Sequence, residues 1–150
     1  MIAAAAVCAR AATEGDRARC IALLKESHVA ARFPWPFRAA RADALFRQHL
    51  ADPSACCIVL DVGGVAQGLL MATVFDHPFG AGLWAKETVW YVAEKYRGRG
   101  AIRMLDAYEA WARGKGCVTI GMASLATNDV AAIYERRGYA AAETHFLKSL

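Results

Sequence analysis

A basic, glycine-rich segment, Arg97-Gly98-Arg99-Gly100, separates two stretches of different periodicity. Residues 89–92 before it are β-branched, aromatic and apolar, which favours a buried strand. After it, apolar residues recur at helical spacing over residues 101–112. Glycines let the backbone approach a ligand closely, and a helix start offers unpaired N–H groups at the positive end of its dipole. The segment therefore suits the binding of an anion such as a phosphate or pyrophosphate. An equally good interpretation is a solvent-exposed connection that binds no ligand.

The elements that must position this segment are predicted from periodicity and turn residues. Strands are expected at residues 3–10, 56–62, 65–75, 84–92, 118–123 and 139–148, and helices at 13–29, 39–50, 101–115 and 128–138. Gly63-Gly64 is a two-residue hairpin signal between the second and third strands. The order β-α-α-β-β-β-α-β-α-β predicts a mixed sheet with helices on its faces, an α/β or α+β fold.

Length and composition limit the classes of protein to which the chain can belong. A chain of 150 residues is long enough for a substantial core, and we expect residues 1–150 to form a single domain. With 57% hydrophobic and 21% charged residues, the composition is that of a globular protein. The net charge of +4 suits an anionic ligand, but no dense cluster of lysine and arginine indicates nucleic-acid binding. No segment has the features of a signal peptide or membrane span, so a cytoplasmic location is expected.

The five cysteines have no C-x-x-C spacing and lie within apolar stretches. We therefore expect neither a metal site nor a disulfide framework. Reduced, buried thiols in a cytosolic protein are the simplest interpretation.

Two aromatic segments could contribute to a binding site. Residues 32–37, Arg-Phe-Pro-Trp-Pro-Phe, cannot form a regular helix because of their two prolines. Their aromatic side chains predict either a plug that closes the core or a lip at the binding site of a second substrate. Residues 75–84 are also aromatic, and neither segment is strongly acidic, which argues weakly against a polycationic ligand.

The strand, basic glycine loop and amphipathic helix together resemble the acetyl-CoA pyrophosphate loop of the GNAT superfamily, whose usual pattern is (Gln/Arg)-x-x-Gly-x-(Gly/Ala). Arg97 and Gly100 match this pattern, whereas Ile102 stands where Gly or Ala is usual. Neither GxxxxGK[ST] nor GxGxxG is present. Residues 134–139, Tyr-Glu-Arg-Arg-Gly-Tyr, resemble the Tyr-x-x-x-Gly-(Phe/Tyr) ending of a second conserved helix of that family. The two motifs occur at the family's spacing and in its order of elements.

This resemblance implies roles for particular residues. The backbone of Tyr91, Val92 and Ala93 would bind the thioester carbonyl of acetyl-CoA. The pyrophosphate would lie in a cradle formed by Arg97, Gly98, Arg99, Gly100, Ala101 and Ile102. Tyr134 would protonate the departing CoA thiolate and contact the co-substrate. In the family an Asn seven residues before this Tyr contacts the pantetheine arm; here Asn128 lies six residues before it and Thr127 lies seven before it.

Acetyl transfer to an amine also needs a base, because a primary amine is mostly protonated at neutral pH. We expect Glu87, a carboxylate on the strand that faces the cleft, to be that base, the alternative being an exposed charge at the strand edge. Tyr134 could likewise be only a packing residue of its helix. His77 and His145 are weaker choices for the base.

The sequence thus predicts a small N-acetyltransferase that uses acetyl-CoA, without a metal, to acetylate a small-molecule or peptide amine by direct transfer in a ternary complex. A homodimer is possible, as in other members of the family, and neither nucleic acid nor membrane is an expected partner. One alternative is a non-catalytic acyl-CoA-binding or sensing module. A basic nucleic-acid interaction domain is a second alternative, which would require a larger basic face and strongly salt-dependent binding.

Overall fold

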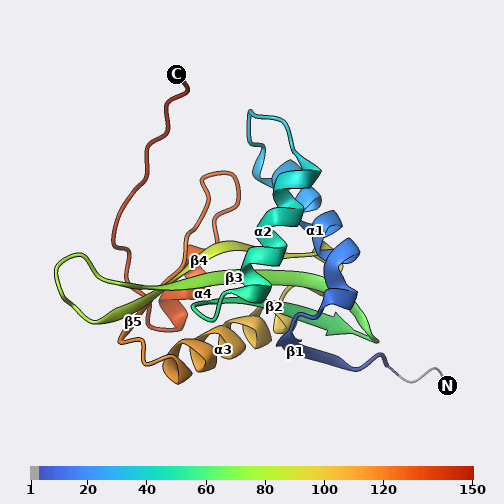
Figure 1. Cartoon of the computed structure of the whole chain (residues 1–150), viewed down its shortest axis with the longest axis horizontal. Helices are drawn as coiled ribbons and strands as arrows, with labels where there is room; N and C mark the ends of the chain where they lie inside the picture. The colour runs from blue at the N-terminus through green and yellow to red at the C-terminus, as the bar shows by residue number, and fades with distance from the viewer. Residues whose placement is uncertain (1–3) are drawn as a thin grey trace.

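A computed structural model describes residues 4–150 of the chain (Figure 1). Its described part contains one mixed sheet in the order β1-β2-β3-β4-β5, made by β1 (Val7–Ala11), β2 (Ala55–Val62), β3 (Val65–Asp76), β4 (Leu83–Val92) and β5 (Thr119–Gly121). The pairs β1–β2, β2–β3 and β3–β4 are antiparallel, and β5 runs parallel to β4. The predicted mixed α/β sheet is confirmed.

Helices cover both faces of this sheet. α1 (Arg17–Ala31) and α2 (Ala39–Ala51) lie on one face, and α3 (Arg99–Gly114) lies on the other (Figure 1). The short α4 (Ala131–Arg136) follows β5, and two single 3-10 turns, η1 (Glu14–Asp16) and η2 (Glu94–Tyr96), precede α1 and α3. The predicted capping box is present, since the Asp16 carboxylate accepts the backbone N–H of Thr13 at 2.8 Å.

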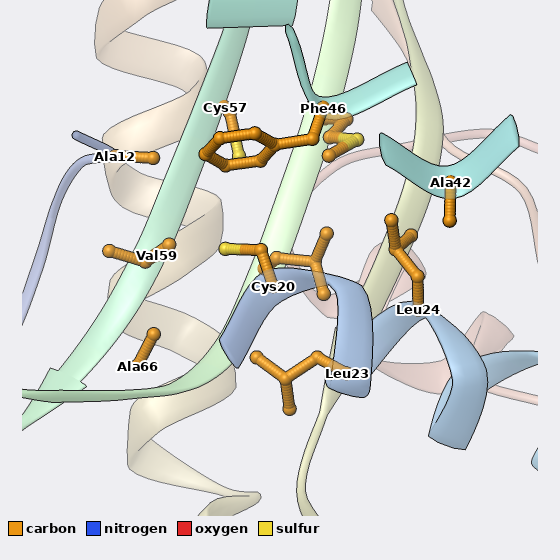
Figure 2. Close-up of a cluster of buried hydrophobic side chains, with 11 residues drawn as sticks. Ala12, Cys20, Leu23, Leu24, Ala42, Phe46, Cys57, Val59 and Ala66 are labelled. Atoms are coloured by element: carbon orange, nitrogen blue, oxygen red, sulfur yellow. The ribbon is translucent and has the colours of Figure 1, made fainter. Parts of the chain in front are cut away.

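Two apolar clusters hold the layers together. The first joins α1 and α2 to the sheet, with Cys20, Leu23 and Phe46 fully buried against Val59 and its neighbours (Figure 2). The second cluster packs α3 against the opposite face of the sheet, and its fully buried members are Leu60, Leu70, Ala72, Met104 and Tyr108. Both faces of β2 and β3 are thus covered, which explains why these strands are continuous apolar runs rather than alternating ones.

The hairpin between β2 and β3 follows the prediction. Gly63 and Gly64 have φ values of +60° and +87°, which favour glycine and suit a two-residue turn. All five cysteines are free; Cys20 and Cys57 are buried as expected, whereas Cys8 is exposed.

Three strand predictions need correction. The first strand spans Val7–Ala11 instead of residues 3–10, of which Ala3 lies outside the described residues. The strand predicted at 118–123 is only Thr119–Gly121. The strand predicted at 139–148 is wrong, because the described residues there form no regular element. This segment begins with three alanines after Tyr139, and its Phe146 is 90% exposed, so it lacks the side chains and buried surface that stabilise a strand.

Candidate active site

A cavity opens where β4 and β5 separate. The two strands pair only from Trp84 to Lys86 of β4, so the rest of β4 continues to Val92 without a partner from β5. The second half of β4 lines one side of this cavity, and Gly98 and Ala101 at the start of α3 lie at one end. The end of α1 and the segment from β5 to α4 complete the lining.

A bulge in β4 determines which side chains face the cavity. Met71 pairs with Val89 and Ala72 pairs with Glu87, so Thr88 is an extra residue in β4. Ala85 packs on the α3 side of the sheet, and Val89 packs on the α1 and α2 side, although both positions are odd. The bulge therefore reverses the alternation of side chains between Glu87 and Val89.

Glu87 and Tyr134 converge on one residue in the wall of the cavity. The Glu87 carboxylate accepts the backbone N–H of Ala123 at 2.6 Å, and the Tyr134 hydroxyl donates to the carbonyl of Ala123 at 2.8 Å. Both side chains line the cavity. The two ionisable groups are thus linked through the backbone N–H and carbonyl of one residue, Ala123.

The surroundings change the acidity of both groups. Burial raises the pKa of Glu87 above its ordinary value, against the opposing effects of the Ala123 N–H and Lys86. Burial also raises the pKa of Tyr134, and the neighbouring Glu87 and Tyr139 add to this rise. A carboxyl with a raised pKa is a stronger base, and a phenol with a raised pKa remains protonated at neutral pH. The arrangement can therefore accept a proton at Glu87 and supply one from Tyr134.

The basic glycine loop closes one end of the cavity. Arg97 donates from Nε to the carbonyl of Val92 at 3.0 Å, which fixes the loop to the end of β4. Gly98 has φ +82° and ψ −115°, a conformation that side chains disfavour, and a Cβ built on it meets no atom within 4 Å. The backbone at Gly98 is therefore open to a ligand at the start of α3, where the first N–H groups lack partners within the helix.

Gly100 has a different function in the structure. A Cβ at this position would lie 2.7 Å from Cδ2 of Leu60, so Gly100 permits close packing of α3 on β2. Ile102 is 36% exposed and does not line the cavity, and its N–H bonds the carbonyl of Gly98 at 3.2 Å. Ile102, which stands where the pyrophosphate-loop pattern usually has Gly or Ala, therefore lies away from the cavity wall.

The position of the shifted asparagine is also explained. Thr127 donates from its hydroxyl to the carbonyl of Ala31 at 3.0 Å and so joins the β5–α4 segment to the end of α1. Asn128, the next residue, lines the cavity. The structure thus brings Asn128, and not the residue seven before Tyr134, to the cavity.

Of the residues predicted from sequence, Glu87, Tyr91, Val92, Arg97, Gly98, Ala101, Asn128 and Tyr134 line the cavity. Four others do not line it: Ala93, which follows β4, and Arg99, Gly100 and Ile102, which lie in the first turn of α3.

The second aromatic segment and both weaker histidine choices lie elsewhere. Residues 75–84 form the β3–β4 turn and the strand ends beside it, at the opposite end of β4, where His77 packs on Trp84 with ring centroids 4.3 Å apart. His145 lies in the exposed C-terminal segment and is paired with Glu143 at 2.9 Å. None of these residues lines the cavity.

Sequence reasoning missed several residues of the site, among them Thr88, Ala123 and Trp90. Thr88 hydrogen-bonds His49, and no sequence signal marks the bulge that creates this contact. Ala123 contacts Glu87 and Tyr134 through its backbone N–H and carbonyl groups, and the identity of its side chain cannot reveal such a role. The indole N–H of Trp90, which lines the cavity, is buried without a hydrogen-bond partner in the described part of the chain. In the sequence, an aromatic residue within an apolar strand indicates such a site residue only weakly.

Residues 19–139 match the model of the acetyltransferase (GNAT) family. This match spans most of the chain. The chain belongs to the GNAT family. The prediction of an acetyl-CoA-dependent N-acetyltransferase is thereby confirmed at the level of the family.

Solved structures agree with this GNAT assignment, while no curated protein matches the sequence. A predicted acetyltransferase with acetyl-CoA from Clostridium acetobutylicum is 15% identical, with a TM-score of 0.79 over 96% of each chain. An aminoglycoside 6'-N-acetyltransferase from Acinetobacter haemolyticus is 18% identical, with a TM-score of 0.73 over 95% of this chain and 98% of the other. A transcriptional regulator from Bacillus halodurans C-125 is 23% identical, with a TM-score of 0.79 over 97% of this chain and 100% of the other. These likenesses show the GNAT fold.

Over residues 4–150, no helix combines the length and apolar character needed to cross a bilayer. Within the same residues, no three His, Cys, Asp or Glu side chains are grouped as metal ligands.

Proposed function

We propose that this GNAT protein transfers an acetyl group directly from acetyl-CoA to a primary amine within a ternary complex. The convergence of Glu87 and Tyr134 on Ala123, beside the unpaired half of β4, is the observation that carries the proposal. It supplies a base and an acid in one cavity, which is what the attack of an amine and the departure of a thiolate require.

The residues present fit acetyl-CoA as the co-substrate. Gly98 leaves the backbone open next to the N-terminus of α3, and Arg97 lines the same end of the cavity, which suits a pyrophosphate. Asn128 and the exposed backbone edge of β4 offer polar groups along the path to Tyr134. When bound, acetyl-CoA supplies an activated acyl group that reacts with a neutral amine.

The chain's own groups then have distinct tasks. Glu87 takes a proton from the amine as the new N–C bond forms. Backbone N–H groups of β4 next to Tyr91 and Val92 stabilise the negative charge that develops on the thioester oxygen. Tyr134 gives its proton to the sulfur as the C–S bond breaks, and its phenolate is reprotonated from solvent. No enzyme nucleophile is required, because both substrates occupy adjoining parts of one cavity.

Isothermal titration with acetyl-CoA, CoA and ATP tests the co-substrate, and release of free CoA thiol in the presence of amines tests the reaction. Micromolar binding of both CoA species, much weaker binding of ATP and amine-dependent thiol release support the proposal. Acetyl-CoA binding without thiol release for any amine would favour the alternative, a non-catalytic acyl-CoA-sensing module. One solved neighbour of the same fold is described as a transcriptional regulator, which is why this alternative is tested.

A further inference from the structure

We infer that the acceptor is a primary monoamine on an apolar, aromatic body, such as an arylalkylamine. This inference rests on the proposed function and names the class of its second substrate. It is carried by a stacked pair of partly exposed aromatic rings, Phe33 and Trp35, of which Phe33 lines a cavity whose lining contains a single carboxylate.

The rim is formed by the α1–α2 connection. Phe33 and Trp35 stack with their ring centroids 4.9 Å apart and an interplanar angle of 13°. His28 of α1 meets Phe33 and Phe37 edge-on, with centroids 5.8 and 5.7 Å away. We call His28, Phe33, Trp35 and Phe37 the aromatic rim.

A hydrogen bond and two prolines make this rim rigid. His28 Nε2 lies 2.7 Å from the carbonyl oxygen of Trp35, and since that oxygen can only accept, Nε2 carries the proton. Pro34 and Pro36 fix two further φ angles in the connection. A rigid surface loses little conformational entropy when it binds a ligand.

The rim does not act only as a plug of the core. Phe37 packs against the core cluster, as a plug would. Phe33 is 36% exposed and Trp35 is 46% exposed, and Phe33 lines the cavity. A ring that lines the cavity and stacks on a second partly exposed ring forms a favourable surface for a planar apolar group.

The charges of the cavity indicate a single amine. Glu87 is the one carboxylate among the residues that line it, and Arg97 is the one basic residue. One carboxylate matches one ammonium group, whereas a polyamine or an aminoglycoside brings several. Those extra charges would be desolvated without partners against an apolar wall that includes Ala31, Val89 and Leu125.

The roof of the cavity adds further apolar surface on this side. The hydrogen bond from Thr127 to the carbonyl of Ala31 holds the β5–α4 segment against the end of α1. Leu125, in that segment, lines the cavity and is 40% exposed. Leu125 and Phe33 therefore offer apolar contacts to the body of an amine whose nitrogen reaches Glu87.

The test measures CoA thiol release by the full chain at saturating acetyl-CoA with 2-phenylethylamine, spermidine, kanamycin and an alanine-terminated peptide. We expect kcat/KM for 2-phenylethylamine to exceed that of each other amine by at least tenfold. Equal or better use of spermidine, kanamycin or the peptide would overturn the inference. Binding of acetyl-CoA without turnover of any of these amines would also overturn it. Preferred turnover of another amine overturns the inference alone, whereas a lack of acetyl-CoA binding, or binding without turnover of any amine, would reject the proposed function as well.

Variants of the rim separate recognition from general damage. Phe33→Ala and Trp35→Ala should each raise KM for 2-phenylethylamine about five- to tenfold while leaving kcat and the Kd of acetyl-CoA unchanged, because ring contacts are made equally in the ground and transition states. Trp35→Phe keeps an aromatic ring and should restore most of the affinity. The control is Phe79→Ala, since Phe79 is 92% exposed on the β3–β4 turn. Unchanged KM in both rim variants would contradict the assignment.

Discussion

Thr88, at the bulge of β4, donates its hydroxyl hydrogen to Nε2 of His49 on α2 at a distance of 2.8 Å. Nδ1 of the buried His49 lies 2.9 Å from the carbonyl oxygen of Leu45, which can only accept, so Nδ1 carries the proton and Nε2 is the acceptor. The bond ties the bulge to the helix layer on the face opposite α3. We expect this bond to help keep Glu87 turned toward the cavity.

Removing this bond should affect catalysis more than co-substrate binding. Thr88→Val leaves Nε2 of the buried His49 without a donor, which should cost about 1–3 kcal/mol of stability. We expect kcat to fall about tenfold, because Glu87 is displaced, with a smaller change in the Kd of acetyl-CoA. Thr73→Val, on β3 and outside the cavity lining, is the matched control.

A double-mutant cycle with His49→Leu separates this positioning role from a general loss of stability. The two substitutions delete the same hydrogen bond, so their effects on kcat should be strongly non-additive. Additive losses would indicate that Thr88 and His49 act independently and would contradict the account.

The two glycines of the basic loop should respond differently to alanine. Gly98→Ala places a side chain at φ +82° in open space beside the cavity, so it should weaken acetyl-CoA binding. Gly100→Ala creates a 2.7 Å contact with Leu60, so it should cost about 1–3 kcal/mol of stability by overpacking. Titration calorimetry and urea denaturation measure the two effects. The reverse pattern, with Gly98→Ala affecting only stability, would reject Gly98 as the ligand contact.

The pH profile should report Glu87. A base must be ionised, and burial raises the pKa of Glu87, so kcat/KM should fall as the pH drops through a value above the ordinary range of a glutamate, about 4.3. Glu87→Gln should lower kcat by about 10²–10⁴ and remove this limb of the profile. Because the acceptor amine also titrates, the limb is assigned by comparing the two proteins with the same amine. A limb that persists unchanged in the glutamine variant would exclude Glu87 as the base.

Acid stability should depend on the ion-pair network at the start of α1. Arg10 binds Asp16 through Nη1 at 2.8 Å and Asp61 through Nε at 2.7 Å. The Arg10 guanidinium holds the pKa of Asp16 below its ordinary value, so this pairing stabilises the fold above the unfolded pKa, about 3.9, and the effect is lost as pH falls through the depressed folded value.

Asp16→Asn should therefore destabilise the protein by about 1–3 kcal/mol at pH 7, and the difference from the wild type should disappear in strong acid. Urea denaturation at several pH values measures this effect. Asp76→Asn, at the exposed end of β3, is the control. An equal loss for Asp16→Asn at pH 2 and pH 7 would show that the charge is not the cause.

The outcome at particular residues shows what the sequence alone could predict. Gly63-Gly64, the capping box at Thr13 and the amphipathic α3 depend on neighbours in the sequence, and each was predicted correctly. The prediction of a strand at 139–148 was wrong because a strand also needs a neighbouring strand to pair with. The nearest candidate, β5, is short and pairs with only three residues of β4. A local pattern carries no information about that partner.

Some residues of the site could likewise be predicted from the sequence, and others could not. The sequence motif identified Arg97, Gly98 and Tyr134, which all line the cavity. It could not distinguish the packing role of Gly100 from a ligand-binding role, because the neighbour that decides, Leu60, lies forty residues earlier in the sequence. The bulge at Thr88 was likewise invisible, since it is a property of register between β3 and β4.

The central claim is that Tyr134 supplies the proton that allows CoA to leave. The most direct test compares Tyr134→Phe with the wild type in two measurements, kcat for thiol release with the best amine substrate and the Kd of acetyl-CoA by calorimetry. We expect kcat to fall by about 10²–10⁴ with the Kd changed less than threefold, because only the transition state uses the hydroxyl. A phenylalanine variant with wild-type kcat would contradict the account and leave Tyr134 as a packing residue of α4.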